Sequence, residues 1–391
     1  MNKETFLLTL ILFLPVVNFE IYLIIIFSFS LVFIVINNKK LKKHIIGQIS
    51  ILIAFVFIYL LIKFFFFESI DDYKEILKLI IFGMVFYSLK NIKLEEVEKL
   101  LYIYILFDFI LSFFQFFKID FVLFDFISIL YNSSAHTISL DYSSVRALGL
   151  SPGPAQHGVI GLFIFTFFIT QIIFNKYKLY RVIGLLSSIL VIVFSQSKSV
   201  VVGLFFILIV ISFFSYFSKN KEAKYFLYSF LGLTTIFFII FLDNILLYFR
   251  QYQKLIELGL GTSSFQARID KWTEMISPVF NEPLLFLLGP GRSYLDYIGI
   301  KNSVFDSDYI YVFINYGFIV LFITVFLIIT FLAKFLINFK RISLESKILF
   351  FTVLVGCVVG IGINFFFDMK ILLLFPFLIY LSKELKNEYK A

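Results

Sequence analysis

Six cationic side chains lie in one turn-rich stretch between two long apolar runs of this sequence. The stretch covers residues 244–307, and its cations are Arg250, Lys254, Arg268, Lys271, Arg292 and Lys301. The charge pattern described below predicts that the stretch lies on the outer side of the membrane. Membrane proteins usually carry few cations on that side. Guanidinium and ammonium groups at that surface are suited to an anion, and we expect the diphosphate of a membrane lipid.

A second candidate segment begins at Arg146 and ends at His157, just before an apolar run. Its glycines and prolines predict irregular backbone, which is tolerated at the membrane face where it lines a watery cavity. Arg146 can offer a planar fork of donors to phosphate oxygens, or it can serve as an interfacial anchor that extends to lipid headgroups. His157 stands at a helix start, where a polar cap is the favoured interpretation and a catalytic base the alternative.

Two further cations lie in tight turns. Lys198 belongs to a short polar turn, residues 195–199, and Arg292 follows Gly289-Pro290-Gly291. A lysine near the membrane is costly unless it meets an anion or water, although polar turns also occur without any ligand. Both residues are candidates to bind the same diphosphate.

Asp306 and Asp308 stand before the next apolar run, and Tyr309 follows them. A carboxylate near cations that hold a diphosphate can accept a proton from an attacking sugar hydroxyl, so Asp306 is the candidate base. Asp308 and Tyr309 are candidates for acid–base work or polar support. The Asp-x-Asp spacing would also suit a divalent cation, and two solvated aspartates before a helix are the plain alternative.

Motifs of soluble enzymes are missing from the sequence. It has no G-x-x-x-x-G-K-[ST] loop for a nucleotide, no H-E-x-x-H and no Cys/His cluster for zinc. We therefore expect no cofactor and no metal, and we expect the energy to come from a substrate already activated in the membrane. The net charge of +8 lies mostly in short loops, which predicts no nucleic-acid partner.

The elements that must position these groups are membrane-spanning helices. The chain has 391 residues, of which 61% are hydrophobic and 21% aromatic, and its mean hydropathy is +0.98. This is more apolar surface than a soluble core can bury. Apolar runs of about 17–25 residues are long enough to cross a bilayer as helices. The sequence predicts an all-α, polytopic transmembrane bundle that forms one integral membrane domain over residues 1–391.

The number of spans is eleven or twelve, because Pro15, Asn18 and Glu20 interrupt the first apolar run. The predicted spans are 5–17, 21–36, 45–67, 76–90, 100–117, 158–175, 182–195, 199–217, 225–243, 308–337, 348–366 and 371–382. Lysines and arginines concentrate in alternate loops between them, which assigns those loops to the cytoplasm. The remaining loops face outward.

Two outward loops, 118–157 and 244–307, are long enough to fold. In the second, Ser263 and Gln266 have the spacing of a capping box, and apolar residues from Phe265 to Val279 recur at helical spacing. We predict an amphipathic helix there, which ends at Pro278 or Pro283. A lid over the bundle and a substrate-binding element are equally favoured roles.

Taken in order, these motifs resemble those of Wzy-type O-antigen polymerases, within the O-antigen ligase and polymerase superfamily. The resemblance covers most of the chain and is carried by its many spans, its loop order and five local features. These are Arg146 followed by Gly149 and Pro154, the Ser197-Lys198 turn, Arg268 four residues before Trp272, Gly289-Pro-Gly291, and Tyr309 leading to Gly317.

The resemblance implies an enzyme that polymerises oligosaccharide units carried on undecaprenyl diphosphate, for O-antigen or capsule. It implies a bacterial inner membrane protein whose active site faces the periplasm, in contact with membrane lipid and with the flippase and chain-length regulator of the same pathway. Arg146, Arg268, Lys198 and Arg292 would hold the diphosphate, and Asp306 would activate the acceptor for inverting transfer. Related ligases commonly have a histidine where this chain has Asp306, which argues against a ligase.

Three alternatives stay open from the sequence. The first is an O-antigen ligase that transfers polymer to lipid A-core. The second is a flippase for the same lipid-linked sugars, which predicts charged residues deep in the spans, such as Asp108. The third is a metal-dependent glycosyltransferase that uses Asp71-Asp72 or the Asp306-x-Asp308 pair.

Overall fold

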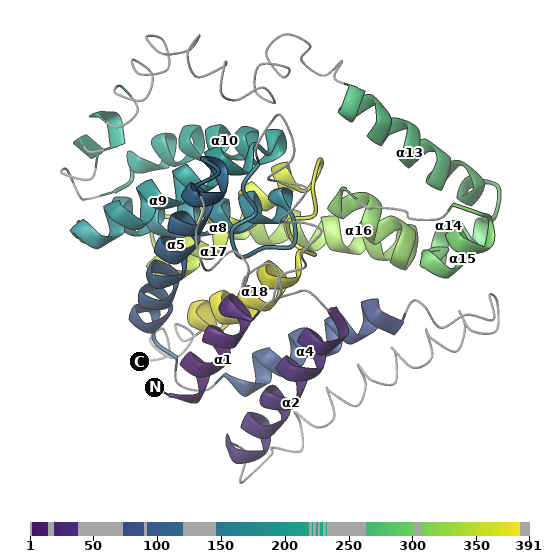
Figure 1. Ribbon diagram of the computed structural model, residues 1–391, viewed down its shortest axis with the longest axis horizontal. Coiled ribbons are helices and arrows are strands. Elements are labelled where there is room, and N and C mark those ends of the chain that lie inside the picture. The colour runs from purple at the N-terminus through teal and green to yellow at the C-terminus, as the bar shows by residue number, and fades with distance from the viewer. Residues whose placement is uncertain are drawn as a thin grey trace.

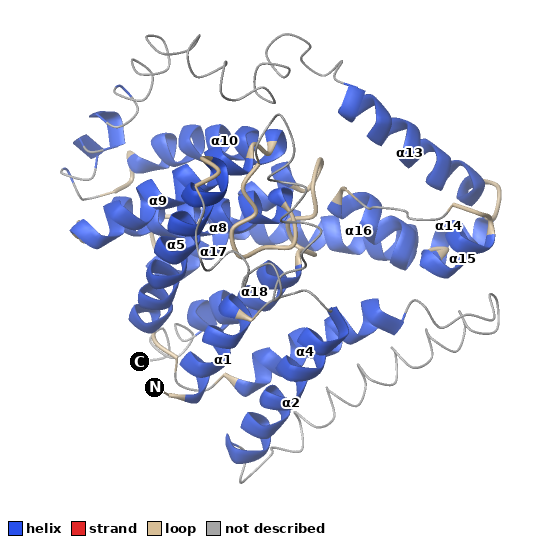
Figure 2. Cartoon of the chain, in the orientation of Figure 1, coloured by secondary structure: helices blue, strands red, loops and turns tan. Residues whose placement is uncertain are grey.

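The computed structural model describes most of the chain as helices joined by loops (Figures 1 and 2). The described residues are 2–14, 19–37, 73–89, 92–119, 146–218, 263–300 and 306–383, with a few positions between 221 and 232. Within these ranges there is no strand. The helices are α1 (Lys3–Phe13), α2 (Phe19–Asn37), α4 (Tyr73–Ser88), α5 (Leu94–Phe116), α8 (Pro154–Phe174), α9 (Leu179–Ser195), α10 (Lys198–Ser215), α13 (Ser263–Phe280), α14 (Pro283–Leu288), α15 (Gly291–Tyr297), α16 (Asp308–Ile337), α17 (Leu344–Val359) and α18 (Met369–Lys383).

The all-helical architecture agrees with the sequence prediction of a membrane-embedded bundle. Three of the described helices, α8, α10 and α16, are long and apolar enough to cross a membrane, and several shorter helices are also apolar. The predicted spans 45–67 and 225–243 fall mostly or wholly outside the described residues. The total of eleven or twelve spans therefore stays a prediction.

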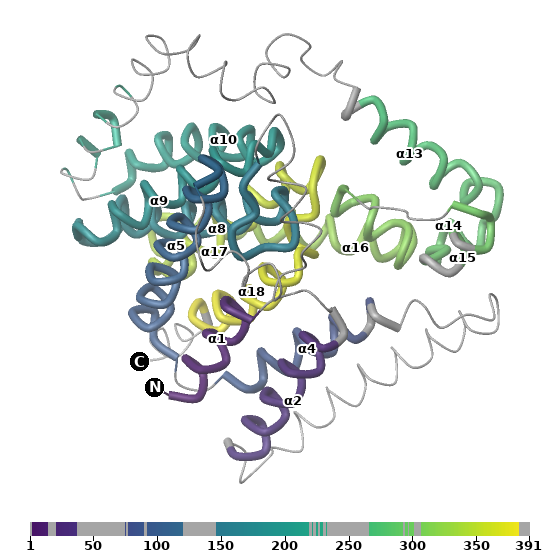
Figure 3. Tube along the Cα trace, in the orientation of Figure 1, coloured from purple at the N-terminus to yellow at the C-terminus, as the bar shows by residue number. Residues whose placement is uncertain are grey.

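Helix α8 forms the centre of the bundle. It is apolar on all sides, as expected of a helix surrounded by others, and its residues from His157 to Ile173 are all buried. Helices α9, α10 and α17 pack around it, and α5 packs against α9 (Figure 1). A Cβ at Gly161 would lie 2.8 Å from Val191 Cγ1, so the glycine allows close approach of α9. Helices α1, α2 and α4 form a separate layer, in which α1 packs against α5 and α18 and α4 packs against α18 (Figure 3).

The connecting segments gather at two opposite ends of this bundle. At one end, which we call the basic end, Arg181 at the start of α9 forms a buried ion pair with Glu98 at the start of α5. Lys347 at the start of α17 stacks on Phe174 and Phe339 at the same end. The other end, which we call the loop end, contains residues 146–153, 195–197, 306–307 and 360–368. The assignment of the basic loops to the cytoplasm stays a prediction.

Helix α13 is the predicted amphipathic helix, and it continues through Pro278 to Phe280. Its buried residues Met275 and Val279 pack in one apolar cluster with Tyr311 of α16, whereas Lys271 is exposed. Of the two prolines expected to end the helix, Pro278 lies inside it, and α13 ends at Phe280, shortly before Pro283 begins α14. The apolar face is therefore covered by the bundle over its second half.

Helix α16 is broken at Gly317, where the backbone has φ of 83° and ψ of 176°. The break accommodates the turn after α14, because Gly289 and Gly317 approach each other with almost no space between their backbones. A Cβ on Gly317 would lie 2.2 Å from the Leu287 carbonyl oxygen, and one on Gly289 would lie 2.4 Å from Gly317 N. The glycines of these two sequence motifs are explained by this single contact.

Replacing Gly289 with alanine should therefore destabilise the protein more than replacing Gly299. Both glycines have positive φ, 83° and 85°, but the Gly299 position has no heavy atom within 4 Å of an added Cβ. Strain alone should cost Gly299→Ala about 1–2 kcal/mol. Gly289→Ala should cost about 1–3 kcal/mol more, because backbone atoms must move. Thermal unfolding of the two variants in detergent measures the difference, and equal unfolding temperatures would contradict the close contact.

The loop between α17 and α18 is longer than the sequence predicted. The span was expected to reach residue 366, but α17 ends at Val359 and residues 360–368 form an irregular loop. The buried carboxylate of Asp308 accepts the N–H groups of Phe365, Phe366 and Phe367 at 2.9, 3.0 and 3.3 Å. These bonds replace those of a helix, so Asp308 stabilises the irregular course of the loop.

Candidate functional site

Arg146 is held at the loop end by the turn between α9 and α10. Its Nε donates to the carbonyl oxygen of Ser195 at 3.0 Å, and the next residue, Ala147, donates its N–H to Phe194 O at 2.9 Å. The arginine side chain is half-buried. Because Ser195 is the last residue of α9, Arg146 lies at the point where the chain turns into α10, which starts at Lys198.

Arg268 lies on α13 and reaches the same end of the bundle. Its Nε donates to Asp306 Oδ2 at 3.1 Å, and its Nη1 donates to the Gly362 carbonyl oxygen at 3.0 Å. The side chains of Arg268 and Asp306 are 32% and 34% exposed, so solvent or a ligand can reach both. Among the residues that the structure describes, Arg268 Nη2 and Asp306 Oδ1 have no hydrogen-bond partner.

The two arginines are connected through the start of α10 and the loop 360–368. Ser199, the second residue of α10, places its hydroxyl 3.5 Å from Gly362 O, the same oxygen that Arg268 contacts. Arg146 contacts the turn between α9 and α10 at Ser195, and Arg268 and Ser199 contact the same carbonyl oxygen of Gly362. Lys198 lies between these two contacts and is half-buried. The structure therefore brings Arg146, Lys198, Arg268 and Asp306 to one end of the bundle from four separate segments.

The side chains of Asp308 and Tyr309 form hydrogen bonds with backbone groups of the protein. Both carboxylate oxygens of Asp308 accept backbone N–H groups, and its own N–H donates to Gly360 O at 2.8 Å. Asp308 is only 3% exposed. The Tyr309 hydroxyl donates to the carbonyl oxygen of Cys357 at 2.8 Å. These contacts fit polar support for the loop end, the second of the two roles considered for these residues.

His157 lies in the first turn of α8 and is fully buried. Its Nδ1 is 3.2 Å from Asp108 Oδ2, and its Nε2 is 2.8 Å from Ser112 Oγ. The ring thus contacts α5 and does not cap α8 through the ring nitrogens. Arg292 belongs to α15, but its side chain lies outside the described residues. Asp71, Asp72, Arg250, Lys254 and Lys301 also lie outside them.

The sequence analysis missed several polar groups at the loop end. Asp108 was noted only as a charge deep in a span, and Gln115, Lys370 and the Gly362 carbonyl were not considered. Asp108, Ser112 and Gln115 have helical spacing within one apolar run, which is a signal that they share a face. The carbonyl of Gly362 had no such signal, because any residue type supplies the same acceptor.

Within the described ranges, no group of three or more His, Cys, Asp or Glu side chains is arranged to hold a metal ion. Asp308 directs both oxygens to backbone N–H groups, which leaves Asp306 as the exposed carboxylate of the Asp-x-Asp pair. The described site can therefore bind an anion through guanidinium groups and can place one carboxylate beside it.

No protein-family model matches this chain, and no curated protein matches it. The site must therefore be interpreted from its own geometry.

Proposed function

We propose that this protein polymerises oligosaccharide units carried on a polyprenyl diphosphate, undecaprenyl diphosphate in bacteria, at the outer face of the inner membrane. The observation that carries the proposal is that Arg146 and Arg268 lie at the same end of the bundle, Arg146 on Ser195 O and Arg268 on the Gly362 carbonyl beside Ser199, with Asp306 in direct contact with Arg268. Guanidinium groups from two separate segments suit the several oxygens of a diphosphate. The neighbouring carboxylate suits a proton acceptor.

The reaction that fits these groups is a glycosyl transfer with inversion. A hydroxyl at the non-reducing end of a new lipid-linked unit attacks the anomeric carbon of the growing chain. The carbon–oxygen bond to the diphosphate breaks, the new glycosidic bond forms, and the hydroxyl proton passes to Asp306. The lipid diphosphate leaves with the bond electrons, and the arginines stabilise the charge that grows on its oxygen.

The paired geometry of Arg268 and Asp306 supports these separate roles. Arg268 uses Nε for Asp306 and Nη1 for Gly362, so its fork is oriented before a substrate arrives. Such preorganised donors stabilise developing charge without reorganisation during the reaction. Asp306 Oδ2 accepts from Arg268, and Oδ1 is the oxygen that we assign to the acceptor hydroxyl. Binding both lipid-linked substrates at one end of the bundle also supplies proximity.

Arg146→Ala should abolish long-chain polysaccharide while the protein still inserts in the membrane. The substitution removes the guanidinium but keeps the backbone hydrogen bond from Ala147 N–H to Phe194 O. It should therefore lower the reaction rate and leave the fold intact. Gel analysis of surface polysaccharide in cells that express the variant measures the outcome. Arg146→Lys keeps the charge but loses the fork, and it should give an intermediate amount of polymer. Full-length product from Arg146→Ala would contradict the role of this residue.

Deletion of the gene separates the proposed function from its competitors. A product with one repeat unit on lipid A-core is expected for a polymerase. Polymer that accumulates on the lipid carrier would indicate a ligase, and the absence of any repeat on the core together with no carrier-linked polymer would indicate a flippase. An unchanged ladder would exclude all three.

The assignment to the outer face has its own test. Single cysteines placed at positions 146 and 268 should react in intact cells with a reagent that does not cross the inner membrane. Labelling only after the inner membrane is opened would place both arginines in the cytoplasm and would overturn the proposal. A chelator in the assay should leave polymer formation unchanged, and inhibition that a divalent cation reverses would instead support the metal-dependent alternative.

A further inference from the structure

Helix α5 carries a line of three polar residues along one face, Asp108, Ser112 and Gln115, which we call the α5 stripe. Their relative exposures are 0%, 0% and 2%. They stand at i, i+4 and i+7 and thus share one side of the helix. Burying a charge and two polar groups among apolar side chains is unfavourable unless each finds a partner. The partners therefore indicate what the α5 stripe does.

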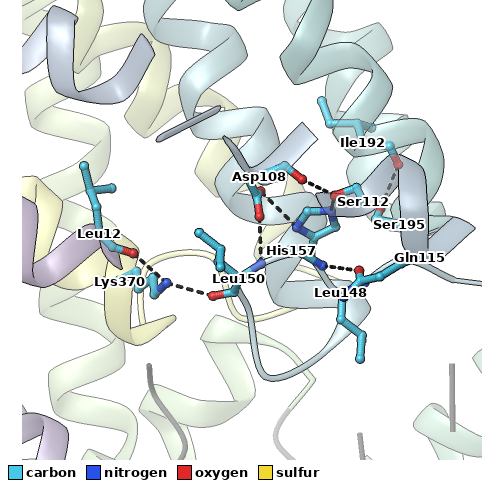
Figure 4. Close-up of polar contacts among 11 residues, drawn as sticks. Leu12, Asp108, Ser112, Gln115, Leu148, Leu150, His157, Ile192, Ser195 and Lys370 are labelled. Atoms are coloured by element: carbon cyan, nitrogen blue, oxygen red, sulfur yellow. Dashed lines mark hydrogen bonds and ion pairs between the residues drawn. The ribbon is translucent and has the colours of Figure 1, made fainter. Parts of the chain in front are cut away.

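Two of these residues bind three consecutive backbone amides in the segment that follows Arg146. Gln115 Oε1 accepts the N–H groups of Leu148 and Gly149 at 2.9 and 2.7 Å. Asp108 Oδ1 accepts the N–H of Leu150 at 2.7 Å (Figure 4). The α5 stripe thus satisfies the polar groups of a segment that has no regular secondary structure.

The same segment is held from its other side by α18. The ammonium group of Lys370 donates to Leu150 O at 2.8 Å and to Leu12 O, at the end of α1, at 2.8 Å (Figure 4). Lys370 is 2% exposed. Leu150 is therefore bound through its N–H by α5 and through its carbonyl by α18, which leaves little freedom for the segment to shift.

Asp108, His157 and Ser112 have the connectivity of a serine hydrolase triad, but the serine hydroxyl is engaged by the backbone and the group is closed to solvent. Ser112 has a single hydroxyl hydrogen, which it donates to the carbonyl oxygen of Asp108. His157 Nε2 lies 2.8 Å from Ser112 Oγ, and the donor in that contact depends on the histidine tautomer. All three side chains are 0% exposed. The ring acts as a brace between α5 and α8.

Gly149 lies directly on this brace. Its φ is +52°, and an added Cβ would lie 2.2 Å from Asp108 Oδ1 and 2.3 Å from His157 Cε1. The backbone at Gly149 therefore lies too close to Asp108 and His157 to leave room for any side chain. Arg146 stands two residues before Leu148, the first amide that the α5 stripe binds.

We propose that Asp108, Gln115 and His157 are positioning residues that set the location of the Arg146 guanidinium from within the bundle. The inference rests on the proposed function, because it concerns how one arginine meets the diphosphate. The contacts form one path, from Gln115 to the amides of Leu148 and Gly149 and from there to Arg146 and Ser195 O. A small displacement of this path moves the guanidinium relative to Arg268, and a shift of about 1 Å can cost about 100-fold in rate.

The test compares Gln115→Leu with Gln115→Glu in the full-length protein. The substrate is undecaprenyl-diphosphate-linked oligosaccharide extracted from cells that lack the gene. Gln115→Leu removes the acceptor at similar volume and should lower kcat about 10- to 100-fold. Gln115→Glu keeps an acceptor oxygen and should restore most of the activity. The matched control is Leu111→Ala, a buried truncation on the same helix, which should lower the unfolding temperature but leave the kcat of the folded protein unchanged.

A double-mutant cycle with Arg146→Lys distinguishes positioning from general support. If Gln115 acts through Arg146, the effect of Gln115→Leu should largely disappear in a protein that already carries Arg146→Lys. In that background, Gln115→Leu should lower kcat by no more than about twofold, which is the usual error of additivity. Fully additive losses, or unchanged kcat in Gln115→Leu, would overturn the positioning role alone. Unchanged activity in both Arg146→Lys and Arg146→Ala would overturn the role of Arg146 and the positioning inference together. Covalent labelling of Ser112 by a fluorophosphonate would also overturn the inference, because the serine would then be a nucleophile.

Discussion

Arg268→Ala should lower the rate of polymer formation by about 100- to 1,000-fold, the usual loss when one preorganised donor to a developing oxyanion is removed. The structure gives this arginine an orientation that an alanine cannot replace, since it bridges Asp306 and the Gly362 carbonyl. Its loss removes a diphosphate donor and also frees the candidate base. The rate should be measured with purified protein and lipid-linked oligosaccharide, and the release of lipid diphosphate should be followed directly.

Two variants serve as controls for Arg268→Ala. Lys271→Ala removes an exposed cation from the same helix, three residues away, and should change the rate little because, unlike Arg268, Lys271 has no described hydrogen bond to Asp306 or Gly362. Arg268→Lys keeps the charge but cannot bind Asp306 and Gly362 with a rigid fork, so its rate should fall between those of wild type and Arg268→Ala. Equal losses in Arg268→Ala and Lys271→Ala would mean that net charge near the surface is sufficient, and the specific role of Arg268 would be wrong.

Substitution of the two aspartates of the Asp-x-Asp pair should have different effects on stability. Asp308→Ala leaves one buried and two partly buried N–H groups without an acceptor, and a fully buried group of this kind costs about 1–3 kcal/mol. Removal of a buried carboxylate offsets part of this cost, so we expect a net loss of stability of about 3 kcal/mol. The protein should then unfold at a markedly lower temperature and lose activity because the loop 360–368 is no longer held.

Asp306→Asn should instead abolish polymer formation with little change in stability. Its side chain is about one third exposed, and exposed ion pairs contribute about 0–1 kcal/mol. Asparagine keeps the shape of the side chain but cannot accept the proton. Thermal unfolding and rate measurements on both variants give a direct comparison. An active Asp306→Asn enzyme would exclude this residue as the base, and a stable Asp308→Ala protein would contradict the structural role of Asp308.

Several features of the site were accessible from residue types and spacing. Arg268, Asp306 and Arg146 were selected because cations and a carboxylate in loops between apolar runs indicate an anion site, and the structure places them at one end of the bundle. The amphipathic helix was also predicted, because its apolar spacing is a local property of about five turns. The choice between Pro278 and Pro283 as its end was left open by the sequence, and in the structure Val279 packs in one apolar cluster with α16 and the helix continues past Pro278.

The difference between Asp306 and Asp308 was not accessible in this way. The two residues have the same type and are two positions apart, so any local pattern treats them alike. Burial separates them: Asp308 turns toward Phe365, Phe366 and Phe367, more than fifty residues away, and Asp306 turns toward α13. The choice between catalytic and structural roles therefore depends on contacts between distant segments.

The amino-acid sequence by itself determined that this is a helical membrane protein, which residues share each helix face, and which loops carry cations. These properties follow from hydropathy and from the 3.6-residue period, both of which act over short distances along the chain. Only the tertiary structure decided that the α5 stripe binds the segment after Arg146 and that the Gly362 carbonyl orients Arg268. Backbone amides and carbonyls are the same in every residue, so only the packing of helices shows which of them a side chain meets.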